Sequence, residues 1–236
     1  MKHKVIMKKY LFLLFILLNF SPIYAQSSEY RIDGKPYCKQ IYDDRNNQIT
    51  SFKDWELIED FFVSPDKTKM LVYHRPDKSR AFFITLYDLK NNNIIAECEP
   101  GWACFGVIWT DDYLIYKWAT SGGGMRFEYR NYQTLTVEKS VTAYFPFEDV
   151  ENNVLICASH FISNDDVTFH NLSDGSLIKT VNLQNELLKK NIYANGISMS
   201  SIKKTGIKKY KFTFLYYRVD ENDQEEDHQI ALEFEL

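Results

Sequence analysis

Residues 61–73 read FFVSPDKTKMLVY, and residues 84–95 read ITLYDLKNNNII. Each segment is an apolar strand, then a polar turn, then a second apolar strand. Ser64-Pro65-Asp66 and the asparagines after Asp88 provide the turns, because Pro, Asp and Asn favour tight turns and tolerate left-handed backbone. Two hairpins this close together, with no helical periodicity between them, predict a unit of four short antiparallel strands.

The second half of this unit recurs along the chain. An aromatic-flanked strand, a polar turn and a short apolar strand follow one another around Asp43, Asp88, Asn131 and Asn171, at spacings of 45, 43 and 40 residues. A period of this length with four short strands is typical of a β-propeller blade.

A resemblance supports the same interpretation. Val63-Ser64-Pro65-Asp66, followed by a strand and then by Ile84–Leu89, resembles the Ser-Pro-Asp repeats of TolB-like and tryptophan–aspartate-type β-propellers. It is best over residues 58–98 and weaker elsewhere, and Thr-Asp-Asp replaces Ser-Pro-Asp at 110–112. The resemblance implies a fold and carries no catalytic residues, since propellers host unrelated functions.

We therefore predict an all-β fold, either a small closed β-propeller or a propeller-like open arc of about four to five antiparallel four-stranded units. Residues 28–52 resemble half a unit, residues 193–236 an irregular last one, and residues 183–190 a short helix. Stacked sheets would form the core, to which 17 Phe, 16 Tyr and 4 Trp contribute rings. The alternative is a β-sandwich built with the same turns.

The N-terminus has the layout of a secretory signal. Residues 1–9 are basic, residues 11–20 form a short apolar run, and Ala25 offers a small residue for cleavage. The run is too short to span a bilayer, which takes about 20 apolar residues. We predict a signal peptide over residues 1–25 and a single propeller-like domain over 26–236. This predicts residence in the periplasm or outside the cell, without membrane insertion after cleavage.

Composition and motifs exclude several classes of function. The formal net charge is −4, and the four lysines of the signal leave the remaining chain more acidic still. Such a chain lacks the clustered Lys and Arg that bind phosphates, so nucleic acid is not an expected partner. No Gly-x-Ser-x-Gly, His-Glu-x-x-His, Walker or Rossmann signature occurs. We predict no cofactor, no metal site and no enzymatic activity.

Four cysteines follow the signal, which allows two disulfides in an exported protein. Cys98 and Cys104 flank a turn-rich loop that could bring them together, so a bridge between them and a pair of free thiols are equally open. Cys157 lies in an apolar run, where a small core residue is at least as good an interpretation as a bridge to Cys38.

Six residues are candidates for a binding face. Trp102 lies in the loop between Cys98 and Cys104, and Trp, Tyr and Arg dominate the hot spots of protein interfaces. His74 and His160 end corresponding strands of the first and third units, which indicates a shared rim. The predicted binding residues are Trp102, Arg75, Tyr116, Arg126, His74 and His160.

The sequence favours an exported, non-catalytic module that binds another protein in the cell envelope or outside the cell. One alternative is a propeller that binds a glycan or small ligand through Trp102 and nearby tyrosines. Another is a hydrolase that uses dispersed carboxylates, namely Asp66, Asp111, Asp112 and Asp165. Acids at such positions are more often turn formers. The acidic stretch 220–227 is expected to be a solvated hairpin tip.

Overall fold

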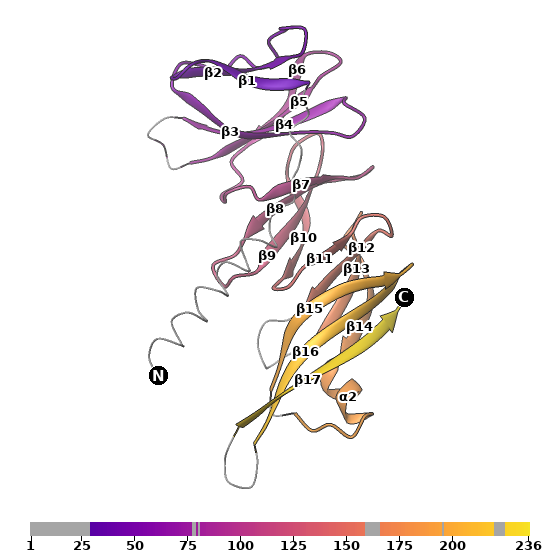
Figure 1. Cartoon of the computed structure of the whole chain (residues 1–236). Coiled ribbons are helices and arrows are strands. Elements are labelled where there is room, and N and C mark those ends of the chain that lie inside the picture. Colours follow the sequence, from indigo (N-terminus) through magenta and orange to yellow (C-terminus); the bar gives the residue numbers. More distant parts are fainter. Residues whose placement is uncertain (1–28, 77–78, 80, 159–165, 195, 220–224) are drawn as a thin grey trace, which may run out of the picture.

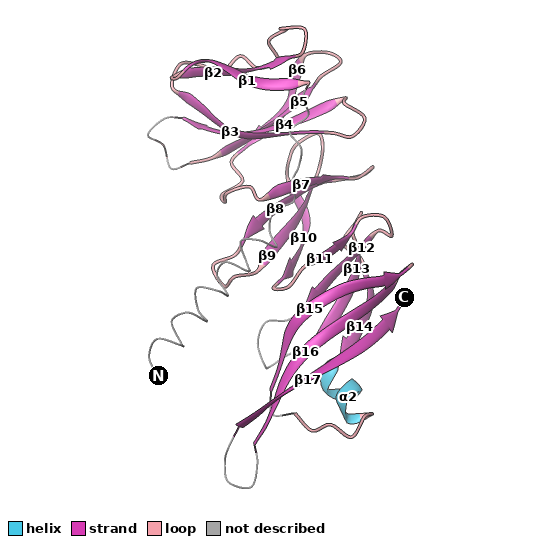
Figure 2. Cartoon of the chain, in the orientation of Figure 1, coloured by secondary structure: helices cyan, strands magenta, loops and turns pink. Residues whose placement is uncertain are grey.

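A computed structural model describes residues 29–76, 79, 81–158, 166–194, 196–219 and 225–236, and strands dominate this part of the chain (Figure 1, Figure 2). The strands form four sheets, here called A to D. Sheet A contains β1 (Tyr30–Lys35), β2 (Cys38–Asp43), β3 (Glu56–Val63), β4 (Lys69–Pro76), β5 (Phe83–Asp88) and β6 (Asn93–Cys98). Sheet B contains β7 (Gly106–Trp109), β8 (Leu114–Ala119), β9 (Met125–Arg130) and β10 (Val137–Ala143).

The second half of the chain repeats this plan with variations. Sheet C contains β11 (Phe147–Asp149), β12 (Val154–Ala158), β13 (Asp166–Asn171) and β14 (Leu177–Asn182). The helix α2 (Leu183–Leu188) follows, close to the predicted position. Sheet D has three long strands, β15 (Gly196–Gly206), β16 (Lys209–Val219) and β17 (Glu225–Glu235).

The prediction of an all-β, propeller-like fold is confirmed, in its open form. The sheets follow one another from the β1 end of the molecule to the β17 end (Figure 1). Among the described strands, β17 pairs with β16 alone and β1 with β2 alone, so no strand pairing joins the two ends of the arc. Four stacked sheets also differ from a sandwich, which has two facing sheets.

The sheets pack face to face, and each inner sheet buries both of its faces. In β8, Leu114, Tyr116 and Trp118 point into a core shared with sheet A. Ile115, on the opposite face of the same strand, joins a core shared with sheet C. This follows from the alternation of side chains along a strand, and it explains why these strands are apolar throughout.

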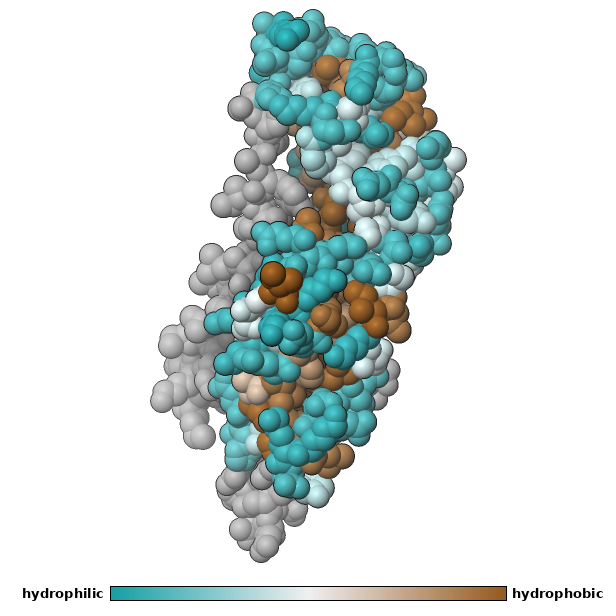
Figure 3. All heavy atoms as spheres, turned by 90° about the vertical axis from the view of Figure 1, so that its right-hand side faces the viewer, coloured by the Kyte–Doolittle hydropathy of each residue, from teal (hydrophilic) through white to brown (hydrophobic). Residues whose placement is uncertain are grey.

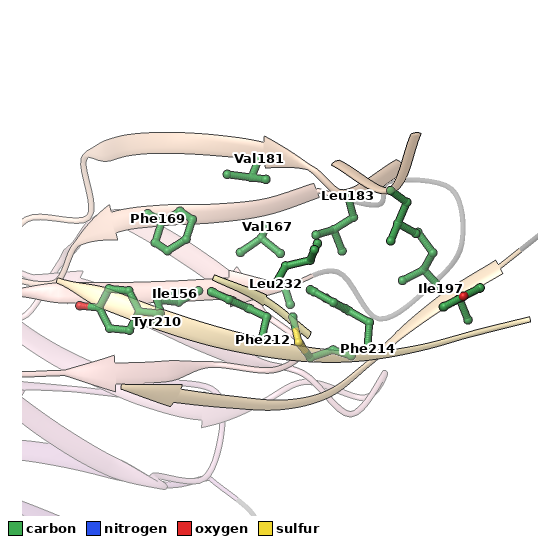
Figure 4. Packing of buried hydrophobic residues seen from close by; sticks show 14 of the residues in the cluster. Ile156, Val167, Phe169, Val181, Leu183, Ile197, Tyr210, Phe212, Phe214 and Leu232 are labelled. Carbon is green, nitrogen blue, oxygen red and sulfur yellow. The ribbon is translucent and has the colours of Figure 1, made fainter. Parts of the chain in front are cut away.

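The last interface, between sheets C and D, is rich in aromatic rings (Figure 4). Phe169 of β13 is fully buried and lies at its centre. Its ring centroid is 5.9 Å from that of Phe212 and 6.2 Å from that of Tyr210, both on β16. The Phe169–Phe212 pair is edge-to-face, and such ring pairs add to the free energy gained by burial alone.

The two ends of the stack are finished differently. At the first end, the β1–β2 hairpin packs Ile41 against Met70 and Val72 of β4. The predicted N-terminal half unit therefore covers the outer face of strands β3–β6. At the other end, the outer face of sheet D is exposed and largely polar, with Lys211, Gln229 and Glu233. A polar outer face is what a stack of sheets needs where it meets water.

The recurring Asp and Asn residues cap the hairpin turns. Asp88 Oδ1 accepts hydrogen bonds from the backbone N–H groups of Lys90 and Asn91, at 2.8 and 3.0 Å. Asp43 caps its turn in the same way, and Asn131 accepts from the second backbone N–H after it. At these three positions the sequence repeat is therefore a repeat of one kind of capped turn, whereas Asn171 donates to the Ser176 hydroxyl and Asp174 accepts the Ser176 backbone N–H.

Several predictions concern residues outside the described part of the chain. They are the signal peptide over 1–25, the positions of His160 and Asp165, and residues 220–224 of the acidic stretch.

The C–D interface predicts the effect of one core mutation. Phe169→Ala removes a buried ring from between two sheets, so we expect the free energy of unfolding to fall by about 3–5 kcal/mol. Urea denaturation followed by tyrosine and tryptophan fluorescence measures it. Lys211→Ala is the control, because Lys211 precedes Phe212 in β16 but lies on the exposed face of that strand. It should change stability by less than about 0.5 kcal/mol. Equal losses for the two variants would contradict the stacking arrangement.

Candidate functional site

The antiparallel hairpins divide the loops between two rims of the stack. The turns β3–β4, β7–β8 and β11–β12 lie on one rim, together with the turns that Asp88, Asn131 and Asn171 begin. We call this the turn rim. The opposite rim carries the loops β4–β5 and β8–β9 and every connection from one sheet to the next. The strand pairing shows that these segments share a rim. Cys98, at the end of β6, pairs with Ile84, next to the β4–β5 loop, and Ala143, at the end of β10, pairs with Met125, next to the β8–β9 loop. We call it the connection rim.

The acidic side chains of the turn rim serve the turns. Asp66 accepts hydrogen bonds from the Ser64 and Thr68 hydroxyls, at 2.6 and 2.8 Å, and from the Thr68 backbone N–H. These bonds, above all that from Ser64, lower the pKa of Asp66 to about 2. The pKa of Asp88 is lowered too, chiefly by the side chain of Asn91. Carboxylates held ionised in this way make poor general acids.

Three of the carboxylates proposed for a hydrolase, Asp66, Asp111 and Asp112, lie within electrostatic reach of Tyr132. Burial is the main cause of the raised pKa of Tyr132, and these three carboxylates raise it further. Asp111 and Asp112 lie exposed in the β7–β8 turn, the counterpart of the turn that Asp66 caps. Within the described residues, no group of three or more His, Cys, Asp or Glu side chains is placed to hold a metal ion.

The connection rim carries the exposed aromatic side chains. Trp102 and Phe105 lie in the β6–β7 connection, Tyr144 in the β10–β11 connection, and Tyr193 between α2 and β15. Tyr37 and Trp55 lie just before β2 and β3, at the same rim, since Glu56 pairs with Pro76 at the end of β4. All the exposed aromatic residues of the described chain thus lie in segments that enter or leave the sheets at one rim.

Trp102 lies together with two other predicted binding residues, Tyr116 and Arg126. The residue is 55% exposed, and its ring stacks on that of Trp118 of β8, with 5.2 Å between the ring centroids and 11° between the planes. The Arg126 guanidinium carbon lies 5.7 Å from the centre of the Trp118 ring. The Tyr116 hydroxyl donates a hydrogen bond to the Trp102 carbonyl oxygen at 2.7 Å, and burial raises its pKa strongly. Tyr116 itself is buried, so it supports the loop and does not present a surface.

Arg75 occupies a comparable position on the neighbouring sheet. Its guanidinium carbon lies 5.8 Å from the centre of the Phe82 ring, and Phe82 stacks on Tyr73 at 5.0 Å. Its Nε donates to Glu59 at 2.6 Å. Sheets A and B therefore each present an arginine over an aromatic ring at the connection rim, which is a favourable cation–π arrangement.

His74 differs from its predicted role. It lies two residues before the end of β4, close to the expected position, but it is only 4% exposed and belongs to the interior of sheet A. Its Nδ1 is 2.7 Å from a Glu56 carboxylate oxygen, its Nε2 is 2.7 Å from the Thr85 hydroxyl, and the Phe52 ring covers it. The position near a strand end was correct, and its assignment to a binding surface is wrong because the segment before β3 folds over it.

The cysteines are free thiols in this structure. Cys98 Sγ is 3.4 Å from an Arg130 guanidinium nitrogen, and Cys104 Sγ is 3.7 Å from the Gly106 carbonyl oxygen. Burial raises the pKa of the Cys104 and Cys157 thiols to about 12, so both stay protonated at neutral pH. The Cys98–Cys104 bridge that the sequence allows is therefore not formed in this structure.

Sequence reasoning missed one aromatic pair. Trp55, 58% exposed, lies 5.4 Å from Tyr37, and its backbone N–H donates to the Tyr37 carbonyl oxygen. Trp55 has φ +72°, a left-handed conformation that is uncommon for a bulky residue. No sequence signal marks this pairing, since the two residues lie in separate loops.

No known protein family and no curated protein matches the sequence. The structure is similar in part to Hsv2 of Kluyveromyces lactis, with 13% identity, a TM-score of 0.39, and coverage of 84% of this chain and 61% of that one. It is also similar to BamB of Moraxella catarrhalis (6% identity, TM-score 0.41, 80% and 57% coverage). A third similar structure is the uncharacterized protein lmo1340 of Listeria monocytogenes (14% identity, TM-score 0.42, 86% and 62% coverage). The chain spans about three fifths of each.

The capped turns predict an acid-sensitive contribution to stability. Asp66 has a lower pKa in the folded chain than the usual 3.8, so its bonds stabilise the fold above pH 4 and are lost as pH falls towards 2. We expect Asp66→Asn to lower the urea midpoint at pH 7 and to match the unsubstituted protein near pH 2. Unfolding curves at pH 7, 4 and 2.5 measure this. Asp111→Asn, in the β7–β8 turn, is the control, and a constant deficit for Asp66→Asn at every pH would contradict the assignment.

Proposed function

We propose that this protein is an exported, non-catalytic module that binds another protein through its connection rim. The observation that carries the proposal is the stack of Trp102 on Trp118 beside Arg126. Exposed Trp, Tyr and Arg side chains on a rigid support are the residues that contribute most to protein interfaces. Here strands β8 and β9 hold two members of the stack in fixed register.

The proposed absence of catalysis is supported by how the polar groups are used. The best-placed carboxylate, Asp66, is hydrogen-bonded within its turn. The buried His74 has Glu56 and Thr85 against its two ring nitrogens. A general base or acid has to reach a substrate, and neither of these groups faces the aromatic rim.

The proposed site of action is outside the cytoplasm. The basic and apolar N-terminal segment supports export. None of the helices in the described residues has the length and apolarity to cross a membrane.

On the face seen in Figure 3, brown patches lie among larger hydrophilic areas. This distribution supports recognition by a few anchoring side chains, because a large apolar interface needs a continuous patch.

The proposal predicts the effect of removing the exposed indole. Tagged protein captures its partner from an extract of the source organism, and the partner is then purified for titration calorimetry. We expect Trp102→Ala to weaken the complex about thirtyfold, as for a hot-spot residue. Ile207→Ala, in the exposed β15–β16 turn of the turn rim, is the matched control and should bind like the unsubstituted protein.

Two outcomes would count against the proposal. Equal binding by Trp102→Ala and the unsubstituted protein would remove the rim from the interface. Saturable binding of neutral oligosaccharides through Trp102, with no protein partner recovered, would favour the glycan-binding alternative, since a flat indole also stacks on a sugar ring.

A further inference from the structure

Arg126 has donors that the protein itself does not use. No hydrogen bond from its guanidinium to another described residue is present, and its ionic contact is with Glu128 Oε1, 3.6 Å from Nε. The other oxygen of Glu128 is bound by Arg130, through Nε at 3.1 Å and a terminal nitrogen at 2.5 Å. Glu128 is therefore committed mainly to Arg130. The Arg126 side chain, 39% exposed, keeps its planar fork of N–H groups available.

Trp118 has a second unused donor beside it. The residue is 8% exposed, and its indole N–H has no hydrogen-bond partner in the described structure. Trp118 and Arg126 are directly paired across β8 and β9, so both donors belong to one place on the sheet. Buried N–H groups without acceptors are uncommon, so an unpaired one indicates that an acceptor from outside the chain could bind to it.

Trp102 covers this place and is attached to a loop. Its ring stacks on Trp118, while its carbonyl oxygen is held by the Tyr116 hydroxyl. Gly101, immediately before it, has φ +82°. The main chain at Trp102 is thus held by this hydrogen bond, while the residue is 55% exposed and its indole is the layer between Trp118 and solvent.

We infer that Trp118 and Arg126 form a carboxylate-binding site, and that it accepts an acidic side chain of a peptide segment of the protein partner. This rests on the proposed function and adds the chemistry of the partner. A guanidinium fork binds a planar carboxylate through two parallel hydrogen bonds, and a neighbouring indole N–H supplies a third donor. A phosphate suits the site less well, because Glu128 lies beside the single available arginine.

The surroundings favour a peptide over an acidic sugar. Phe105 is exposed in the same connection as Trp102, and its backbone N–H donates to the carbonyl oxygen of Lys117, the residue before Trp118. An aromatic side chain next to the carboxylate site suits an apolar residue adjacent to the acid in a peptide. The ring of Phe105 offers no hydrogen-bond donor or acceptor to the hydroxyl groups of a sugar.

The test uses the indole N–H signals of the purified protein in ¹H–¹⁵N spectra. The chain has 4 tryptophans, so the Trp118 signal is assigned by its loss in Trp118→Phe. The probe is the blocked dipeptide acetyl-Phe-Glu-amide, and acetyl-Phe-Gln-amide is its neutral match. We expect the acidic probe to move the Trp118 signal saturably and the neutral one to bind at least about tenfold more weakly.

Variants link the shift to the proposed donors. Arg126→Gln should weaken the acidic probe about tenfold or more, and Arg126→Lys should lose part of the affinity because a point charge replaces a planar fork. Lys211→Gln, which removes a positive charge from the exposed outer face of sheet D, is the control and should leave affinity within about twofold. Unchanged Trp109 and Trp55 signals in each variant show that the fold is retained.

Three results would overturn the inference. They are equal binding of the two dipeptides, affinity unchanged by Arg126→Gln, and tighter binding of methyl glucuronide than of the acidic dipeptide at the Trp118 signal. The proposed function is tested separately by the captured partner. If Trp102→Ala weakens binding of that partner but Arg126→Gln binds it normally, the proposed binding module is supported and the carboxylate site is ruled out.

Discussion

Sheets with two apolar faces cannot stand alone in water, and this constraint governs the whole molecule. Sheet B shows it most clearly, since alternate residues of β8 enter two different cores. A chain of such sheets must be stacked, and the stack must end on something that is not apolar. The β1–β2 hairpin at one end and the polar face of sheet D at the other meet that requirement without closing a ring.

Charged groups between the sheets fix how the sheets are stacked. Lys117 of sheet B, almost fully buried, bonds to both oxygens of Glu148 in sheet C at 3.0 and 2.9 Å. At the next interface, Asp149 accepts from Lys204 and from the Tyr210 hydroxyl. Burial raises the pKa of Asp149, but hydrogen bonds from Asn152, Lys204 and Tyr210 outweigh it and lower the pKa. Such groups contribute modestly to stability, but a misplaced sheet would leave them without partners.

The sequence was most informative where backbone geometry limits the choice of residue. The Asp and Asn residues that cap turns recur at a regular spacing, so the unit, its length and most strands could be predicted from them. Burial was harder, because it depends on segments distant in sequence. His74 was placed correctly near a strand end, yet Phe52 and Glu56 enclose it. Trp102 and Arg126 were found as separate residues, whereas their common partner Trp118 was not singled out as part of the site.

The two rims differ because their residues are bound by different requirements. On the turn rim, Asp66, Asp88 and Asn131 accept hydrogen bonds from backbone N–H groups two residues further along the chain, so these side chains are used by the fold itself. The connections have only to bridge one sheet to the next, and their side chains are left for other uses. Trp102 illustrates this, since its carbonyl oxygen helps to hold the loop while its indole is presented outward. This difference is why we propose the connection rim as the binding surface: its side chains are the ones that the fold itself needs least.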